Sequence, residues 1–401
     1  MKALLPKIKF KNFDEKWNRK KLHSIAPLRG GFAFKSEKFQ NTGIPVVRIS
    51  NIKFDGTVGG EFEYYSKIIP DEKFVLRGRS ILLAMSGATT GKIAMLDSEE
   101  EYYQNQRVGY FQNTGEVDYE FLSSVLQTKA FTNQLNAVLV AGAQPNISSK
   151  EIDSFGFYLP DSTEEQSAIG SLFRTLDDLL SNYKENLANY QSLKATMLSK
   201  MFPKAGQTVP EIRLDGFEGE WENKRADEIF KSVSEKNRAL LPLLSASQID
   251  GMVLRDEIGI DIKYDEATLN NYKLVKPGQF VIHLRSFQGG FALSKLEGIT
   301  SPAYTIIDFI DKVNNLPDFW NSILTSRDFI KRLETVTYGI RDGKSISFKD
   351  FSSLKFVFPE FKEQQAIGSY FSNLDNLINS HQEKISQLET LKKKLLQDMF
   401  I

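Results

Sequence analysis

The 401-residue sequence contains no cysteine and only three histidines, His23, His283 and His381. The absence of cysteine excludes disulfides and thiolate metal sites and is consistent with a reducing compartment. Because the histidines lie far apart in the sequence, we do not expect a histidine-based metal site. No apolar run reaches membrane-spanning length, and residues 1–12 lack the apolar core of a signal peptide. We therefore expect a cytoplasmic protein that makes no contact with a membrane.

Motifs for several kinds of catalysis are also absent. We find no Asn/Asp-Pro-Pro-aromatic methyltransferase motif, no dinucleotide-binding glycine pattern, no context for a Ser-His-Asp triad and no HExxH zinc motif. The formal net charge is zero, with 51 Lys and Arg against 51 Asp and Glu. Zero net charge alone argues against a protein that binds nucleic acid by itself, but it is compatible with local basic patches or a basic partner. These absences favour a binding protein over an enzyme.

What the sequence does contain is one unit of roughly 200 residues used twice. The opening segment PKIKFKNFDEKW at residues 6–17 recurs as PEIRLDGFEGEW at residues 210–221. In the middle of each copy, residues 119–135 and 317–333 match more faintly, and both patterns indicate helices. Each copy ends in one long segment, and the two segments match. The first starts EEQSAIGS and the second starts KEQQAIGS.

These long segments predict two amphipathic helices, over residues 164–202 and 362–401. Apolar residues recur at alternating steps of three and four, as at Ile169, Phe173 and Leu176, which indicates a narrow coiled-coil seam. A helix of this length extends on the order of 55 Å at about 1.5 Å per residue, far beyond an average globular helix. We therefore expect the two helices to pair within the chain, rather than to lie in separate cores or to form a homodimer.

The regions before the long helices alternate short apolar runs with Gly and Asn turns, which is typical of strands. Strands without regular helical crossovers predict an α+β fold. Thr163 and Gln166 have the spacing of a capping box at the start of the first long helix. The strands are expected within residues 44–50, 80–85, 92–96, 241–246, 279–284, 291–294 and 303–309.

Two segments invite a catalytic interpretation. The glycine-rich SGATTGK at residues 86–92 is one residue short of a phosphate-binding loop, and Ile93 replaces its magnesium-binding hydroxyl, so we expect a hairpin turn. Asp318, Asp342 and Lys344 loosely resemble the metal site of a magnesium nuclease. The first copy has no matching carboxylate–lysine pair, and Asp-Gly-Lys is a common turn sequence.

Polar, basic segments with glycines lie between the expected strands of both copies. Asn, Gln and Arg hydrogen-bond to base edges, while Lys, Ser and backbone amides hold phosphates. A solvated turn explains any one segment, but together the segments indicate nucleic acid as the ligand. The candidate DNA-binding residues are Arg29, Lys35, Arg48, Asn51, Lys53, Thr89, Lys92, Gln104, Asn105, Arg107, Gln144, Asn146, Lys236, Arg238, Gln248, Arg285, Gln288, Arg341 and Lys344. Those chosen for base contacts are Arg48, Asn51, Gln104, Asn105, Arg107, Arg285, Gln288 and Arg341.

With its paired P-x-I-K/R openings, EQ-x-A-I-G helix starts and tandem long helices, the chain resembles the specificity subunit of a type I restriction–modification system. The resemblance covers essentially the whole chain. It implies two α/β target-recognition domains, each recognising half of a split DNA site, joined by two long antiparallel coiled-coil helices in a pseudo-twofold internal repeat. The implied parts are target-recognition domain 1 at residues 1–160, a helical spacer at 161–203, target-recognition domain 2 at 204–359 and a second helical spacer at 360–401.

The resemblance also implies a non-catalytic chain within a multisubunit restriction endonuclease and DNA adenine methyltransferase. The helices would dock two modification subunits, which bring S-adenosylmethionine, while restriction subunits bring ATP-driven translocation and cleavage with Mg²⁺. No cofactor is expected on this chain itself. Two alternatives remain open from the residues: a magnesium-dependent nuclease acting alone, and a coiled-coil scaffold without a role in DNA recognition.

Geometry gives a separate argument for a split target. Antiparallel helices of about 55 Å would place two recognition domains at opposite ends of a rod. That spacing suits half-sites about one helical turn of DNA apart, roughly 34–36 Å. Because the two copies differ in sequence, the target is expected to be asymmetric.

Overall fold

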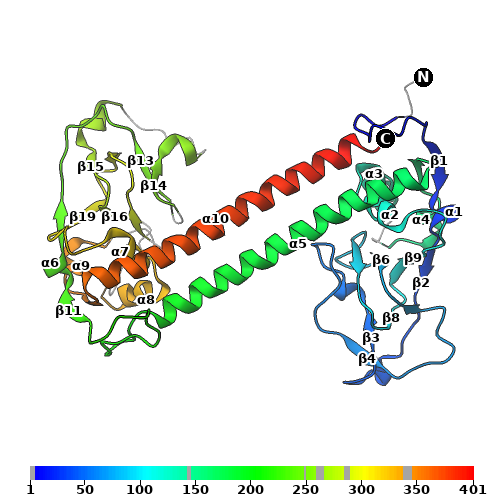
Figure 1. Ribbon diagram of the computed structural model, residues 1–401, viewed down its shortest axis with the longest axis horizontal. Helices are drawn as coiled ribbons and strands as arrows, with labels where there is room; N and C mark the ends of the chain where they lie inside the picture. The colour runs from blue at the N-terminus through cyan, green and yellow to red at the C-terminus, as the bar shows by residue number, and fades with distance from the viewer. Residues whose placement is uncertain (1–4, 142–145, 248–249, 259–265, 284–289, 337–345) are drawn as a thin grey trace. The chain divides into compact units, whose positions relative to one another are not determined.

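The computed structural model describes residues 5–141, 146–247, 250–258, 266–283, 290–336 and 346–401 (Figure 1). The chain divides into two compact units. Unit 1 comprises residues 1–184 and 383–401, and unit 2 comprises residues 185–382. Each unit therefore contains the mixed region of one copy, the first part of that copy's long helix and the last part of the other long helix.

Unit 1 is built on short strands. They are β1 (Asn18–Lys21), β2 (Leu28–Gly30), β3 (Ile44–Val47), β4 (Glu63–Tyr65), β5 (Val75–Leu76), β6 (Ser80–Ala84), β7 (Ile93–Leu96), β8 (Tyr102–Gln104), β9 (Val108–Phe111) and β10 (Gly156–Leu159). One four-stranded sheet has the order β2-β9-β6-β7, and a second has the order β4-β3-β8-β5 with β3 and β8 parallel. Strands β1 and β10 pair separately. The mixed sheets confirm the α+β expectation.

The helices of unit 1 are short except for the last. They are α1 (Leu22–Ile25), η1 (Ser36–Lys38), η2 (Ile49–Asn51), α2 (Tyr119–Val125), α3 (Lys129–Ala141), α4 (Ser149–Asp153) and α5 (Thr163–Lys200), where η marks a 3₁₀ helix. The helical segment expected at residues 119–135 is two helices rather than one. The Thr128 hydroxyl accepts a hydrogen bond from the Phe131 amide at 3.3 Å and so caps α3, which interrupts the run.

Unit 2 repeats the strands and α-helices of unit 1 in the same order, whereas its 3₁₀ helices lie at other places. Its strands are β11 (Glu222–Arg225), β12 (Phe230–Val233), β13 (Leu244–Ser247), β14 (Gly251–Leu254), β15 (Lys273–Val275), β16 (Phe280–Ile282), β17 (Phe291–Leu293), β18 (Gly298–Thr300), β19 (Thr305–Phe309) and β20 (Lys355–Phe358). Its helices are α6 (Ala226–Ile229), η3 (Arg255–Ile258), η4 (Glu266–Asn271), α7 (Pro317–Leu324), α8 (Arg327–Val336), α9 (Phe348–Ser352) and α10 (Phe361–Asp398).

The sheets show that the repeat is structural as well as sequential. The order β12-β19-β16-β17 in unit 2 matches β2-β9-β6-β7 in unit 1. The pairs β13–β14 and β15–β18 are linked by a parallel bridge between Leu243 and Ile299, as β3 and β8 are linked in unit 1.

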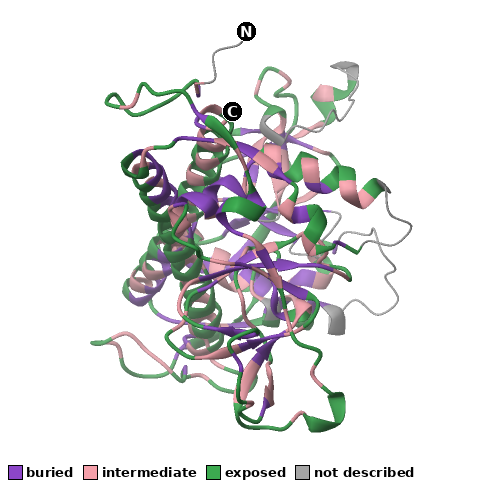
Figure 2. Cartoon of the chain, turned by 90° about the vertical axis from the view of Figure 1, so that its right-hand side faces the viewer, coloured by how far each residue is buried: buried purple, intermediate pink, exposed green. Residues whose placement is uncertain are grey.

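An aromatic cluster closes each unit around the end of a long helix. In unit 1, Phe400 lies 6.1 Å from Trp17, 5.8 Å from Phe121 and 5.7 Å from Phe173, measured between ring centroids. Phe202 makes the equivalent contacts in unit 2, with Trp221, Phe319 and Phe371. The first part of each long helix is therefore buried in the core of the unit in which that helix begins. In Figure 2, most strands are coloured as buried, whereas the long helices carry buried, intermediate and exposed residues.

Within each unit, the two long helices run antiparallel. In unit 1, Asp177 of α5 forms an ion pair with Lys392 of α10. In unit 2, Lys194 of α5 forms an ion pair with Asp375 of α10. A second ion pair in unit 1, Lys184–Glu389 at 2.8 Å, lies later on α5 and earlier on α10, which is the antiparallel order. In unit 2, the Tyr190 ring lies 5.2 Å from the His381 ring between centroids, earlier on α5 and later on α10 than Lys194 and Asp375. The predicted pairing within the chain is thus confirmed (Figure 1).

The EQ-x-A-I-G motif attaches each long helix to its unit. In unit 1, Gln166 Oε1 accepts from the Asp118 amide and its Nε2 donates to the Pro160 carbonyl, both at 2.8 Å. The capping box predicted for Thr163 and Gln166 is therefore wrong. The Ser162 hydroxyl is the cap instead, accepting from the Glu165 amide at 3.2 Å.

Candidate nucleic-acid interface

Polar loops from separate parts of unit 1 meet where β2, β3, β6 and β8 end. The Phe32 amide donates to the Gln104 carbonyl at 2.8 Å, which joins the loop after β2 to the end of β8. The Asn105 amide donates to the Val47 carbonyl at 3.0 Å, which joins the loop after β8 to the end of β3. Three of the segments chosen from the sequence are thus held together by backbone hydrogen bonds.

The β6–β7 turn and the segment before α4 complete this surface. The Met85 amide donates to the Arg107 carbonyl at 2.9 Å, and the Ile147 amide donates to the Met85 carbonyl at 3.0 Å. The Thr89 hydroxyl donates to the Ile49 carbonyl at 3.1 Å. We call the combined surface the loop edge; it comprises residues 31–35, 48–57, 85–92, 105–107 and 146–147. As predicted, SGATTGK is the turn of a β-hairpin.

The loop edge presents positive charge to solvent. Lys35, Lys92 and Arg107 are exposed there, as is Asn146. Among the described residues, no acidic partner forms an ion pair with any of these three cations. Phosphate groups are a natural counter-charge for such a surface.

Four further candidates are half-buried at the loop edge and have partners within unit 1. Arg48 forms an ion pair with Glu63 at 2.7 Å, and Lys53 Nζ lies 3.4 Å from the Ser50 carbonyl. Asn105 Oδ1 accepts from the Arg107 amide at 3.4 Å. Like Thr89, described above, these residues both shape the loops and reach solvent.

Two residues chosen for base contacts are placed differently from the expectation. Gln104 is completely buried, and its Nε2 donates to the carbonyls of Arg29 and Val108 at 2.8 and 2.7 Å. Asn51 is also buried; its Oδ1 accepts from the Arg48 amide at 3.0 Å and its Nδ2 donates to the Glu61 carbonyl at 2.9 Å. Both amides hold the loops in place, so a base contact would require these bonds to break.

Arg29 is likewise engaged inside the unit. Its guanidinium donates to Gln104 Oε1 at 3.1 Å, the Glu72 carbonyl at 2.9 Å and the Val75 carbonyl at 2.8 Å. It also lies over the Tyr110 ring, 4.7 Å from the centroid. Burial lowers the pKa of Arg29. As placed, Arg29 braces β2 against the β5 region and does not face a ligand.

In unit 2, Lys236 and Arg238 are both exposed on the segment after β12. Arg238 forms an ion pair with Glu235 at 2.7 Å, and Lys276 reaches the same carboxylate at 3.2 Å. Hydrogen bonds from Arg238 and Lys276 lower the pKa of Glu235. The cluster therefore carries more positive than negative charge. Gln144, Gln248, Arg285, Gln288, Arg341 and Lys344, together with Asp342 of the nuclease alternative, lie outside the described residues.

Sequence reasoning missed one side chain at the loop edge. Phe54 directly follows the RISNIK segment, and its ring is 73% exposed. Lys92 Nζ lies 4.9 Å from the centroid of this ring. An apolar residue one position beyond a polar segment gives no signal in a search for hydrogen-bonding side chains.

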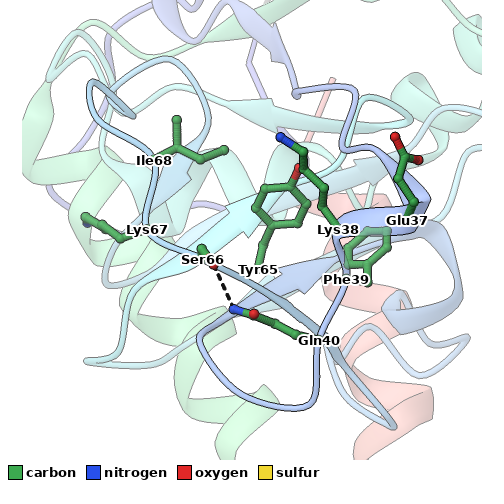
Figure 3. A pocket seen from close by; sticks show the side chains of 8 residues that line it. All are labelled: Glu37, Lys38, Phe39, Gln40, Tyr65, Ser66, Lys67 and Ile68. Atoms are coloured by element: carbon green, nitrogen blue, oxygen red, sulfur yellow. Dashed lines mark hydrogen bonds between the residues drawn. The ribbon is translucent and has the colours of Figure 1, made fainter.

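A hollow also lies outside the loop edge in unit 1. This hollow of about 490 Å³ beside η1 and β4 is lined by mixed side chains, with Gln40 Nε2 donating to Ser66 Oγ at 2.9 Å (Figure 3). Glu37 is the one carboxylate in its lining. No group of three His, Cys, Asp or Glu side chains suited to a metal ion is present among the described residues. Over the same residues, no helix is long and apolar enough to cross a membrane.

The duplicated units match a known protein family. The model of the type I restriction modification DNA specificity domain matches the chain twice, at residues 14–190 and 218–390. The chain belongs to this family. The family indicated by the repeated motifs is thus confirmed, and the two matches correspond to the two copies of the repeat.

The chain is also similar to individual proteins. The chain is 26% identical over 196 residues to the type I restriction enzyme MjaVIII specificity subunit of Methanocaldococcus jannaschii, covering 46% of this chain and 45% of that relative. The chain therefore spans less than half the length of this curated relative. The crystal structure of the type I restriction–modification S subunit from M. genitalium has a TM-score of 0.63 at 16% identity, covering 99% of both chains, and shares the fold. The HsdS subunit from Thermoanaerobacter tengcongensis has a TM-score of 0.42 at 17% identity, covering 98% of this chain and 99% of that one.

Proposed function

We propose that this chain is the DNA-sequence specificity subunit of a type I restriction–modification complex. The observation that carries the proposal is the double match to the DNA specificity domain, one match for each copy of the repeat. In unit 1, the loop edge supports it, because five separate segments meet on one surface and three of them carry an exposed Lys or Arg side chain. Each unit would recognise one half of a bipartite, asymmetric target in double-stranded DNA.

The loop edge suits contacts of two kinds. Exposed lysines such as Lys35 and Lys92 supply point charges for phosphates, and Arg107 presents a guanidinium suited to two hydrogen bonds with a base. The buried amides of Asn51 and Gln104 fix the backbone from which those side chains project. In unit 2, Lys236 and Arg238 take the phosphate-contacting role.

Methyl transfer and cleavage belong to partner subunits in this proposal. The exposed faces of α5 and α10 dock two modification subunits, which bind S-adenosylmethionine, and restriction subunits bring ATP and Mg²⁺. The chain itself holds no cofactor and catalyses no step. We place the assembled complex in the cytoplasm, where it meets the DNA.

A chromosome-wide methylation measurement tests this function. Single-molecule sequencing of a strain with and without the gene for this chain is expected to show a two-part methylated motif that disappears with the gene. Exchanging residues 14–190 for the same domain of a relative should change one half of the motif and leave the other half intact. A motif that survives deletion of the gene would disprove the proposal.

The two alternative functions have less support. For the nuclease, Asp318 lies in the first turn of α7, where the equivalent helix α2 has Glu120, so its position follows the structural repeat. A scaffold without DNA recognition would leave the exposed cations of the loop edge unexplained. Incubation of the purified chain with DNA and Mg²⁺ distinguishes the first alternative, because our proposal predicts no cleavage without partners.

A further inference from the structure

The loop edge contains an exposed aromatic ring, Phe54, that the hydrogen-bonding candidates do not explain. The ring is 73% exposed, whereas most Phe residues of this chain lie in the buried clusters. A single exposed apolar side chain needs no explanation by itself. The conformation and surroundings of Phe54 supply the further observations.

The hairpin that carries Phe54 is braced at its tip. The Lys53 amide donates to the Thr57 carbonyl at 2.9 Å, and the Gly56 amide donates to the Lys53 carbonyl at 3.3 Å. Asp55 Oδ1 accepts from both the amide and the hydroxyl of Thr57, at 3.0 and 2.7 Å. The hydrogen bonds from Thr57 lower the pKa of Asp55, because they favour the ionised carboxylate that accepts them. Phe54 is thus held outward by a turn whose own polar groups are satisfied.

This tip is also fixed to the remainder of unit 1. The Met95 amide at β7 donates to the Gly56 carbonyl at 3.0 Å, and Thr57 bridges to Met95. Gly56 adopts a φ of 84°, which only glycine accommodates readily and which lets the chain turn here. The ring therefore projects from a rigid support, which keeps the entropic cost of ordering it on a ligand small.

One cation lies directly over the ring, and a second cation belongs to the preceding residue. The Lys92 ammonium lies over it, 4.9 Å from the centroid, and Lys53 precedes it in the sequence. Asp55, the nearest carboxylate in the sequence, accepts a hydrogen bond from the Thr57 hydroxyl, and the charge of Lys184 also lowers its pKa. An exposed apolar ring beneath an ammonium group fits a partner with an apolar interior and an anionic surface. Duplex DNA has both, in its stacked bases and its phosphates.

We propose that Phe54 inserts between adjacent base pairs of the bound DNA, while Lys92 and Lys53 contact the flanking phosphates. Proteins that bend DNA commonly use Phe or Leu in this way, and the inserted side chain partly unstacks one base step. Flexible pyrimidine–purine steps are the easiest to open, so the step at Phe54 is expected to be of that kind. This inference rests on the proposed function, because it assigns a role to a residue within the DNA-binding surface.

Binding and DNA distortion measured together test the inference. The complex that the full chain forms in its host is prepared with wild-type chain, Phe54→Ala and Phe54→Leu. Affinity is measured on a duplex carrying the motif found by methylation sequencing, with a fluorescent adenine analogue placed at successive positions. We expect Phe54→Ala to bind about 10- to 100-fold more weakly and to lose the fluorescence increase that reports unstacking. Phe54→Leu should retain most of both signals, since Leu is also an effective wedge.

A matched control variant separates insertion from general loss of apolar surface. Ile69→Ala removes another exposed side chain of unit 1, 84% exposed and outside the loop edge, and should change neither signal. Equal binding by Phe54→Ala and wild type overturns the inference, as does weaker binding with the unstacking signal intact. A wild-type complex that does not distinguish the motif from other sequences would instead refute the proposed function.

Discussion

At the scale of single residues, the loop edge offers two exposed cations with different expected roles, Lys92 and Arg107. A phosphate contact is independent of sequence, so Lys92→Ala should weaken binding to all duplexes and reduce the slope of log affinity against log salt by about 1. A base contact is specific, so Arg107→Ala should cost about 1–3 kcal/mol at one position of the motif and relax the preference there. Binding titrations over a range of salt concentrations, on duplexes varied at each position, measure both.

Lys20→Ala is the control for these two variants. Lys20 lies on β1, outside the loop edge, and forms an ion pair with Asp161 at 2.8 Å. Removing it should leave the salt slope and the motif unchanged. If Lys92→Ala behaves like Lys20→Ala, Lys92 does not contact phosphate. If Arg107→Ala weakens every sequence equally, its guanidinium does not contact a base.

Also at this scale, the two copies stabilise an equivalent buried carboxylate in different ways. Glu363 in unit 2 is bound by Arg213, with Nε–Oε1 and Nη2–Oε2 distances of 2.8 and 2.7 Å. Its equivalent in unit 1, Glu165, accepts from Trp17 Nε1 at 3.2 Å, and among the described residues its Oε2 has no hydrogen-bond partner. Lys9, which replaces Arg213, pairs with Asp14 instead. Burial raises the pKa of Glu165, because the Trp17 hydrogen bond and the charge of Lys9 offset only part of the lost hydration.

Glutamine at these two positions is therefore predicted to have opposite effects on stability. The raised pKa means that folded unit 1 binds the Glu165 proton more tightly than the unfolded chain does. Its contribution is therefore favourable at low pH and declines as the pH rises from the unfolded value of about 4.3 through the folded pKa. Glu165→Gln should remove this decline and make unit 1 more stable at pH 7.

Glu363→Gln leaves Arg213 without its counter-charge and should cost about 3 kcal/mol. Urea unfolding at pH 4.5 and pH 7 measures both; a loss of stability at pH 7 in Glu165→Gln would contradict the first expectation.

Choosing candidate residues by side-chain type could identify the segments of the loop edge, but it could not assign the role of each side chain. Arg, Asn and Gln are equally able to bind a base and to satisfy a buried carbonyl. Gln104 and Asn51 do the second, and only burial distinguishes them from Arg107. The segments themselves were predictable, because polar side chains and glycines interrupt apolar strands at those points. Phe54 was not, because its importance depends on exposure rather than on side-chain chemistry.

At the scale of secondary-structure elements, a helical glycine controls how closely α2 approaches α5. A Cβ on Gly170 would lie 2.6 Å from the Phe121 amide nitrogen and 2.8 Å from Asp118 Oδ1, so the first turn of α2 occupies its place. On Gly368, the repeat equivalent, the nearest atom is the flexible Leu316 Cδ2 at 3.0 Å. The glycine of EQ-x-A-I-G is thus required most strictly in unit 1.

Alanine at this glycine tests the close approach. In an exposed helix, Gly→Ala stabilises by about 1 kcal/mol, so destabilisation here would have the opposite sign. We expect Gly170→Ala to cost about 1–3 kcal/mol, as overpacked cores do, and Gly368→Ala to cost less. Ser171→Ala, at the adjacent exposed position, should stay within about 0.5 kcal/mol of wild type. Urea midpoints give the ranking, and a stabilised Gly170→Ala would show that α2 moves aside freely.

The elements that the sequence predicted are those with a local pattern, and they include seven of the twenty described strands. The strands within residues 80–85 and 92–96 are continuous apolar runs on either side of a glycine turn, and they form β6 and β7. The long helices were predictable from their period, and α5 and α10 begin and end within three residues of the expected limits. The break between α2 and α3 was missed, because the apolar spacing continues across it while Thr128 caps a new helix.

At the scale of the whole molecule, the chain is a tandem duplication in which each copy completes the other. Met201, directly after α5, is buried in unit 2, although α5 starts in unit 1, and Met399, directly after α10, is buried in unit 1. Each helix thus supplies core residues to both units. Swapping one domain for a relative's should therefore succeed only when the boundaries preserve these helix ends.

The length of the paired helices should set the length of the gap in the DNA target, which is the stretch between the two half-sites where no base is recognised. Inserting one heptad after Lys184 and one after Gln382, the equivalent position, keeps the seam in register and lengthens each helix by about 10.5 Å. At about 3.4 Å per base pair, the gap is expected to grow by at most about three base pairs, with both half-sites unchanged. Replacing seven exposed residues of each helix without changing its length is the control and should leave the gap as it is. Methylation sequencing of strains carrying these variants gives the gap directly. An active insertion variant with the original gap would rule out the helix pair as its determinant.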